Sequence, residues 1–258
     1  MKHAAIKNAN NFIRVLFKSI LLQAFLLTVL EMPAVYGHAN SADKDSTHVT
    51  KNKKFQVLTI QERLQVFYPV DSADYSVKVC VDVPDNHNPE RVYVKGEPGH
   101  VFLILTKRNP LSGEVITQSF GFYPRLPVSC LFKQTRSKIL DNSNREYDAS
   151  IEKKLTMEEF AFLLRQCIEL SKRKYNLKKF NCYDYVLQVF NSLPGIEKLP
   201  VTKVRFPFIF GRGGSPCGLY RDLKKLMTSG SSWSPYINFG LSISPGPDPS
   251  QNSIMSFK

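Results

Sequence analysis

Cys182, in the segment Phe180-Asn-Cys-Tyr-Asp-Tyr185, is the residue whose setting best suits covalent chemistry. Asn181 is a preferred helix N-cap, so Cys182 takes the first position of a helix expected over 182–191. There, unpaired backbone N–H groups and the helix dipole stabilise a thiolate and can hold a developing oxyanion. Cys182 is therefore a candidate nucleophile, and a half-cystine or an inert buried thiol are the alternatives.

His100 is the candidate base among five histidines. It begins the apolar run His100-Val-Phe-Leu-Ile-Leu-Thr106, expected to be a central strand of a sheet. An imidazole at the mouth of such a strand needs a polar partner, and a thiolate at a helix N-terminus suits it. A strand-edge histidine that faces water is the alternative. His87 lies in a turn, and the remaining three fall in the expected signal or linker: His3, His38 and His48.

A third polar side chain would have to orient the imidazole from the neighbouring strand. The runs 100–106 and 114–122 flank Asn109-Pro-Leu-Ser-Gly113, which predicts a hairpin. If paired residue numbers sum to about 220, Gln118 shares the face of His100, and a slip by one residue substitutes Ser119. The sequence leaves the register open, and either side chain is otherwise a plain solvent-facing strand residue.

The elements around these residues predict an α+β fold with an antiparallel sheet packed on the cysteine helix. A strand-rich extension is expected over 54–96, with short strands at 55–60, 64–67, 75–83 and 91–94. The capping box Thr156-Met-Glu-Glu159 begins a helix with an apolar stripe. The main domain is expected over 97–228, and the Ser/Pro/Gly-rich tail 229–258 is expected to stay unfolded.

The N-terminus carries the features of an export signal. Four basic residues precede 19–30, an uncharged run of about twelve residues, too short for a bilayer that needs roughly twenty. A cut after Gly37 or Ala39 suits signal peptidase, which predicts a signal over 1–39 and a linker over 40–53. The mature protein is then secreted or periplasmic with no transmembrane span; a retained membrane-surface anchor is the alternative.

Composition narrows the class of partner. At 258 residues, 43% hydrophobic and 22% charged, the chain is neither disordered nor fibrous. The net charge of +13 favours an anionic cell-wall or membrane-surface substrate. Basic residues are dispersed and no reading motif accompanies them, so no specific nucleic acid is expected.

Cysteine and histidine spacing predicts neither a metal nor a cofactor. There is no CxxC and no HExxH, and the two usable histidines lie far apart. Five cysteines in an exported chain leave one over; if Cys182 stays free, the other four form up to two disulfides in one of three connectivities.

Three segments together resemble a known family. Gly99-His100-Val-Phe-Leu-Ile-Leu, Ser119-Phe-Gly-Phe-Tyr-Pro124 and Phe180-Asn-Cys-Tyr-Asp-Tyr-Val are similar, in order and setting, to the circularly permuted papain-like branch of the NlpC superfamily. A further stretch, 213–223, resembles a loop and helix of many such secreted bacterial proteins. The likeness covers about half of the chain, from 97 to 225, and its individual pieces are short.

This resemblance implies a secreted cysteine peptidase or amidase-type hydrolase. Cys182 would attack an amide, peptide or acyl-ester carbonyl, and His100 would take and return the proton. An acyltransferase that uses the same pair, and a non-enzymatic binding module that keeps the fold, are the alternatives. The family pattern departs at Cys217, where a glycine is expected, and offers no clear third residue.

Overall fold

The computed structural model describes residues 59–94, 97–207 and 211–246. The expected signal peptide 1–39 and linker 40–53 lie outside these ranges. Contacts divide the chain into residues 1–55 and 56–258, and all elements below belong to the second unit.

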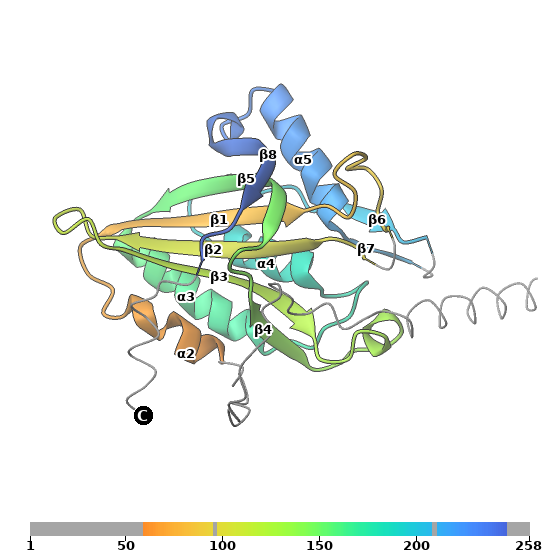
Figure 1. The fold of residues 1–258 in the computed structure, drawn as a ribbon, viewed down its shortest axis with the longest axis horizontal. Coiled ribbons are helices and arrows are strands. Elements are labelled where there is room, and N and C mark those ends of the chain that lie inside the picture. The colour runs from red at the N-terminus through yellow and green to blue at the C-terminus, as the bar shows by residue number, and fades with distance from the viewer. Residues whose placement is uncertain (1–58, 95–96, 208–210, 247–258) are drawn as a thin grey trace, which may run out of the picture. The chain divides into compact units, whose positions relative to one another are not determined.

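A six-stranded antiparallel sheet forms the centre of this unit (Figure 1). Its order is β4-β3-β2-β1-β5-β8, and a separate hairpin pairs β6 with β7. The strands are β1 (Asp74–Asp82), β2 (His100–Arg108), β3 (Val115–Pro124), β4 (Ser137–Asp141), β5 (Glu146–Leu155), β6 (Lys203–Arg205), β7 (Arg212–Gly214) and β8 (Ile237–Ile243). The expected α+β class with an antiparallel sheet is confirmed.

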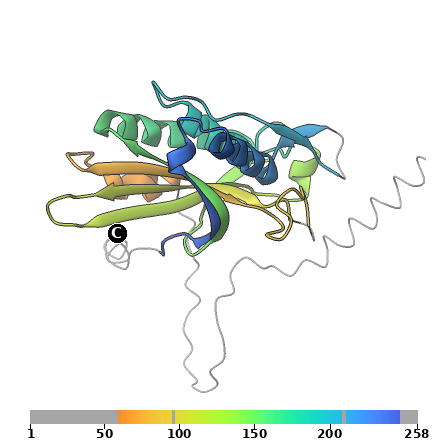
Figure 2. The same ribbon diagram turned by 90° about the horizontal axis from the view of Figure 1, so that it is seen from above.

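Four α-helices and three short 3₁₀ turns complete the described part. They are α2 (Ile60–Leu64), α3 (Met157–Ser171), α4 (Cys182–Asn191), α5 (Pro216–Thr228), η1 (Gln65–Phe67), η2 (Ser129–Leu131) and η3 (Ser234–Tyr236). Figure 2 shows α3 and α5 over the same side of the sheet. Within the described ranges, no helix combines the length and the apolar character that crossing a bilayer requires.

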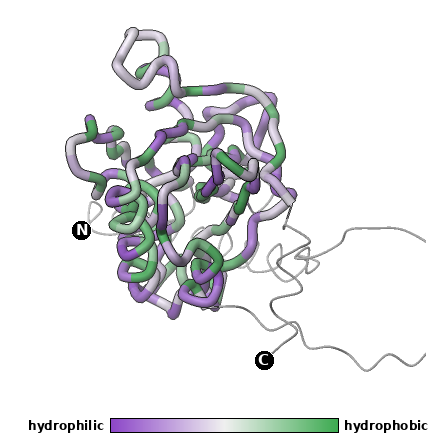
Figure 3. Tube along the Cα trace, turned by 90° about the vertical axis from the view of Figure 1, so that its left-hand side faces the viewer, coloured by the Kyte–Doolittle hydropathy of each residue, from purple (hydrophilic) through white to green (hydrophobic). Residues whose placement is uncertain are grey.

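Strand alternation gives the sheet two chemically different faces, because successive side chains point to opposite sides. The helix face carries an apolar set that joins the main core with α3, α4 and α5: Val77, Val79, Val81, Val101, Leu103, Leu105, Phe120 and Phe122. The far face carries Cys80, Phe102, Ile104 and Tyr147 as a smaller cluster. Green and purple stretches alternate along the Cα tube in Figure 3, as expected of elements with one buried side.

Phe122 joins the sheet to the segment that leads into α4. Its ring is fully buried and stacks on Tyr185 at 4.9 Å and Tyr175 at 5.4 Å between ring centroids. Phe180 meets the same ring edge-on at 5.3 Å. Stacked and edge-to-face aromatic pairs add to plain area burial, so this cluster determines where the N-terminus of α4 sits against β2 and β3.

Two regions differ from the expectation drawn from composition. The stretch expected to be an extension, 54–96, contains β1, which pairs with β2 on one side and β5 on the other at the centre of the sheet. Thr59 and Glu62 form a capping box at the start of α2, and the strand expected at 64–67 is instead the end of α2 followed by η1. Most of the strand expected at 55–60 lies outside the described residues. Short apolar runs do not distinguish a strand from a buried helical turn.

The tail expected to stay unfolded over 229–258 contributes structure in its described part, 229–246, and residues 247–258 lie outside the described ranges. Trp233 is buried and its indole N–H donates to the Glu197 carbonyl, and β8 pairs with β5. Its Ser, Pro and Gly residues favour an irregular chain. Burial of the Trp233 ring and pairing of β8 with the edge strand β5 stabilise a regular structure in spite of this preference.

Phe122→Ala should lower the free energy of unfolding by about 3–5 kcal/mol, because it empties a fully buried aromatic site. Phe132→Ala is the matched control: that ring is 60% exposed, so its removal should cost less than about 0.5 kcal/mol. Denaturant unfolding followed by circular dichroism measures both. Equal losses would contradict the assignment of Phe122 to the core.

Candidate functional site

Cys182 occupies the first position of α4, and Asn181 caps the helix. The Asn181 side-chain oxygen accepts from the amides of Tyr183 at 2.9 Å and Asp184 at 3.3 Å, while Asp184 accepts from the Asn181 amide at 3.0 Å. The side-chain Nδ2 group of Asn181 also donates to the backbone carbonyls of Leu177 and Gly214. Two of the helix N–H groups expected to hold an oxyanion are thus already bonded to the cap.

The thiol of Cys182 is buried, with only 6% of the residue exposed. Burial raises its pKa, and hydrogen bonds from the Val101 backbone, the Tyr175 hydroxyl and the Tyr183 backbone offset this only in part. The pKa of Tyr175 is itself raised well above its usual value by burial, so its hydroxyl keeps its proton. The net effect favours a neutral thiol, whereas an activated nucleophile needs a lowered thiol pKa.

His100 does not meet Cys182. The helix touches β2 at Val101, whose backbone hydrogen-bonds with the thiol and whose side chain belongs to the helix-face core. Because neighbouring side chains of a strand point to opposite faces, His100 points to the far face. Its ring stacks on Tyr123 there, 4.3 Å between centroids. The expected pairing of thiol and imidazole is therefore not formed.

On the far face, His100 lies in a closed polar cluster. It is 4% exposed and its Nε2 atom has no hydrogen-bond partner among the described residues. The same holds for Oδ1 of Asn142, and both atoms converge on the space above Gly121, where any Cβ would clash with them. Burial, and secondarily the positive charge of Arg145, lowers the pKa of His100 well below its usual value. The buried imidazole is neutral.

Neither orienting candidate contacts His100. In the observed register Phe102 lies opposite Gly121 and Ile104 opposite Ser119, which places Gln118 on the helix face, away from the imidazole. Gln118 accepts there from the Arg63 guanidinium at 3.1 Å. Ser119 shares the far face but lies level with Ile104 rather than with His100. The sum of the paired residue numbers differs from 220 by an odd number. Relative to β2, each side chain of β3 therefore points to the face opposite to the expected one.

All five cysteines are free thiols and all are buried. The expected disulfides do not form in the structure: Cys80 lies on the far face, Cys167 within α3 and Cys217 within α5. Cys130 and Cys217 donate hydrogen bonds to the carbonyls of Pro127 and Arg91. Over the described ranges, no three His, Cys, Asp or Glu side chains gather as metal ligands.

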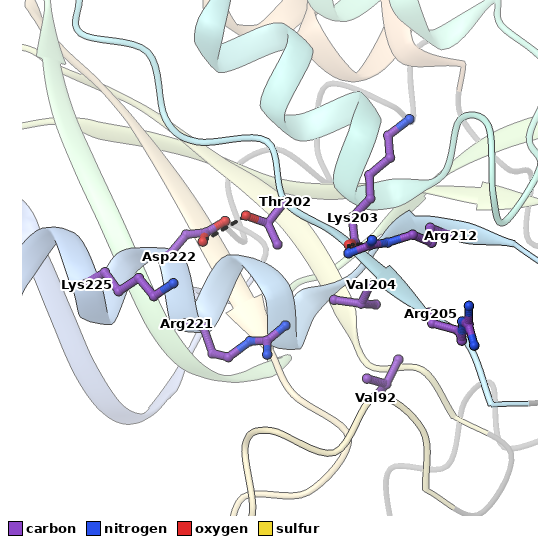
Figure 4. A pocket seen from close by; sticks show the side chains of 9 residues that line it. All are labelled: Val92, Thr202, Lys203, Val204, Arg205, Arg212, Arg221, Asp222 and Lys225. Carbon is purple, nitrogen blue, oxygen red and sulfur yellow. Dashed lines mark hydrogen bonds between the residues drawn. The ribbon is translucent and has the colours of Figure 1, made fainter.

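A basic pocket of about 470 Å³ lies between the β6–β7 hairpin and α5 (Figure 4). Its lining contains five cationic side chains: Lys203, Arg205, Arg212, Arg221 and Lys225. None of the five takes part in an ion pair among the described residues. In Figure 4, Arg221 and Lys225 approach from α5 and Arg212 from the hairpin, whereas Lys203 extends away from Arg221.

Asp222 is the single carboxylate in this lining. It is 5% exposed, and its Oδ1 atom accepts from the Thr202 hydroxyl at 3.0 Å while Oδ2 has no partner among the described residues. Burial raises the pKa of Asp222 despite this hydrogen bond and the charges of Lys225 and Arg221. One weakened acid therefore does not balance the cations around it.

The sequence did not point to this pocket. Its basic residues come from three elements and are spaced too widely to read as a cluster, and the small Lys/Arg groups along the chain lie elsewhere. One local signal was present: Ser215 before Pro216 marks the start of α5, the helix that carries Arg221 and Lys225. A scan against protein-family models, a search of curated proteins and a search of solved structures each returned no match.

The neutral, buried His100 makes stability depend on pH. Below about pH 6.5 the unfolded chain binds a proton at this position that the folded chain excludes, so stability falls on acidification. Relative to His100→Gln, wild type should lose about 1.4 kcal/mol of unfolding free energy per pH unit below that point.

Urea unfolding of the two proteins from pH 7.5 to 5 measures this difference. His87→Gln, at an exposed turn, is the control and should follow wild type. Parallel pH profiles of wild type and His100→Gln would show that His100 takes up a proton in the folded protein.

Proposed function

We propose that the chain is a binding module for an anionic ligand, held in the basic pocket between β6–β7 and α5. The observation that carries this proposal is the set of cationic side chains, unpaired among the described residues, around one pocket. Cationic groups that line one pocket attract an anion into it. The pocket volume also falls within the range of small-ligand sites, about 300–1,000 Å³.

The side chains favour a phosphate-like or carboxylate group. Arginine offers a planar fork of donors that matches both groups in a bidentate way. The guanidinium of Arg212 is held in place because Nε and Nη2 donate to the Lys203 carbonyl at 3.2 and 2.9 Å. A preorganised donor loses less entropy when it binds its ligand.

Asp222 lies in the same lining, but its Oδ2 atom is buried and has no partner among the described residues. The proposal therefore specifies the ligand by its anionic group, which the arginines would bind.

Pyrophosphate is the simplest probe of the pocket. Isothermal titration of the full chain should show saturable binding, and Arg221→Gln should weaken it about tenfold, because one charged hydrogen-bonding group is lost. Raising the ionic strength should weaken binding further. Arg108→Gln is the matched control. This arginine is exposed at the end of β2, does not line the pocket, and its loss should leave the affinity unchanged. Binding that ignores Arg221→Gln would overturn the pocket assignment.

Thiol chemistry at Cys182 is the second candidate function, favoured by the donors that surround its sulfur. It corresponds to the permuted papain-like hydrolase or acyltransferase implied by the resemblance. It requires a base, and His100 lies on the other face of the sheet. The candidate also needs a deprotonated thiol, whereas burial raises the pKa of all five cysteines.

Alkylation of the native protein with iodoacetamide separates the two functions. A binding module should react at all five thiols at least ~100-fold more slowly than in denaturant, with no effect of His100→Ala on Cys182. A hydrolase should show one fast thiol at Cys182 that slows when His100 is removed. Mass spectrometry of the modified peptides identifies which thiol has reacted.

A further inference from the structure

We infer that the end of the molecule that carries the basic pocket docks on an anionic lipid bilayer, with the loop of residues 125–136 as its apolar contact. This inference extends the proposed function, because it names a membrane surface as the source of the anionic group. It rests on a separate set of residues, so the two can fail independently.

The docking loop, residues 125–136, exposes large apolar side chains. Leu126 is 58% exposed, Val128 41% and Phe132 60%. An isolated exposed apolar residue is ordinary, but three within seven positions form a patch. Exposed Leu and Phe side chains are the ones that gain most from entering the boundary between headgroups and acyl chains.

Backbone hydrogen bonds hold the loop in this form. The Arg125 amide donates to the Arg136 carbonyl at 2.8 Å, which closes the loop at its base. Within it, the Cys130 amide donates to the Leu126 carbonyl at 3.2 Å, and the Leu177 amide donates to the Cys130 carbonyl at 3.1 Å. The apolar side chains are therefore presented outward by a fixed scaffold, and their exposure is not the result of a loop without contacts.

The charge of the loop matches an anionic surface. Arg125, Lys133 and Arg136 are exposed, and residues 125–136 contain no Asp or Glu. Lys174 and Lys179 are also exposed, and the pairing of Thr135 with Tyr175 brings their segment next to the loop. Among the described residues, none of these five cations takes part in an ion pair. Each basic residue near an anionic leaflet contributes about a fivefold gain in binding.

The basic pocket lies at the same end of the sheet as the docking loop. Residues 176–181 connect the two: Leu177 bonds to Cys130 on one side, and the Asn181 side chain bonds to the Gly214 carbonyl, in β7, on the other. Figure 1 places the β6–β7 hairpin and the η2 turn toward one end of the molecule, away from the turn that joins β2 to β3. One bilayer surface can therefore face both features.

The combination of apolar and basic groups favours a bilayer over other anionic partners. A soluble phosphate or a wall polymer would bind the cations but would make no apolar contact with the exposed Leu and Phe side chains. A protein partner would use the apolar patch, and it becomes an outcome of the test rather than a second proposal.

Vesicle co-sedimentation of the full chain tests the inference, with phosphatidylcholine alone and with added phosphatidylglycerol. We expect binding to the anionic vesicles, and a loss of about tenfold in Leu126→Ser/Phe132→Ser because two apolar contacts are removed. Leu111→Ser is the matched control: this side chain is 96% exposed at the β2–β3 turn, at the other end of the sheet. It should bind like wild type.

A local fluorescence measurement keeps the test decisive if another part of the chain also binds vesicles. Tryptophan emission of Phe132→Trp should shift to the blue with anionic vesicles and be quenched by brominated lipid, whereas Leu111→Trp should show neither change. The native Trp233 is buried and gives a constant background. If the indole introduced by Phe132→Trp remains in water on vesicle-bound protein, the inference is overturned, and docking that needs a protein partner would overturn it as well.

The same variants separate this inference from the proposed function. Leu126→Ser/Phe132→Ser should bind pyrophosphate like wild type, because the docking loop does not line the pocket. If Arg221→Gln leaves pyrophosphate affinity unchanged while the loop variant loses vesicle binding, the pocket proposal fails and the membrane surface stands. The reverse pattern removes the membrane surface and keeps the pocket.

Discussion

The contact between the first turn of α4 and Val101 of β2 determines what the rest of the molecule can do. It places the thiol of Cys182 against a strand backbone rather than beside a side chain that could activate it. Because side chains alternate along a strand, the same contact directs His100 to the far face. The aromatic cluster around Phe122 holds α4 in this position, so a rotation of the helix would expose several large rings to water.

Burial then decides the charge state of the groups on both faces. Desolvation disfavours the charged form, so it raises the pKa of Cys182 and lowers that of His100. A catalytic pair needs the opposite shifts, namely an acidic thiol and an imidazole able to take a proton. On the far face, Arg145 pairs with Asp82, its Nε donating at 3.0 Å, and reinforces the neutral state of the imidazole.

The cationic side chains that are available to bind an anion lie away from Cys182 and His100. They are on the β6–β7 hairpin, on α5 and around residues 125–136. These cations are exposed or line a pocket, and in the described part of the chain none is paired with a carboxylate. Cations that are widely spaced along the chain are thus brought to one end of the sheet by the fold. Recognition of anions accounts for this distribution better than acyl chemistry at Cys182 does.

Local patterns by themselves determined the amphipathic helices, the β2–β3 hairpin and the N-cap at Asn181, because each depends on residues within a few positions of one another. Only the tertiary structure decided the strand register, the central place of β1 and the faces on which Cys182, His100 and Gln118 lie. A shift of one residue reverses every face of a strand at little local cost, so packing across the sheet has to choose between the two. The pocket has the same origin, since its arginines become neighbours only when the hairpin meets α5.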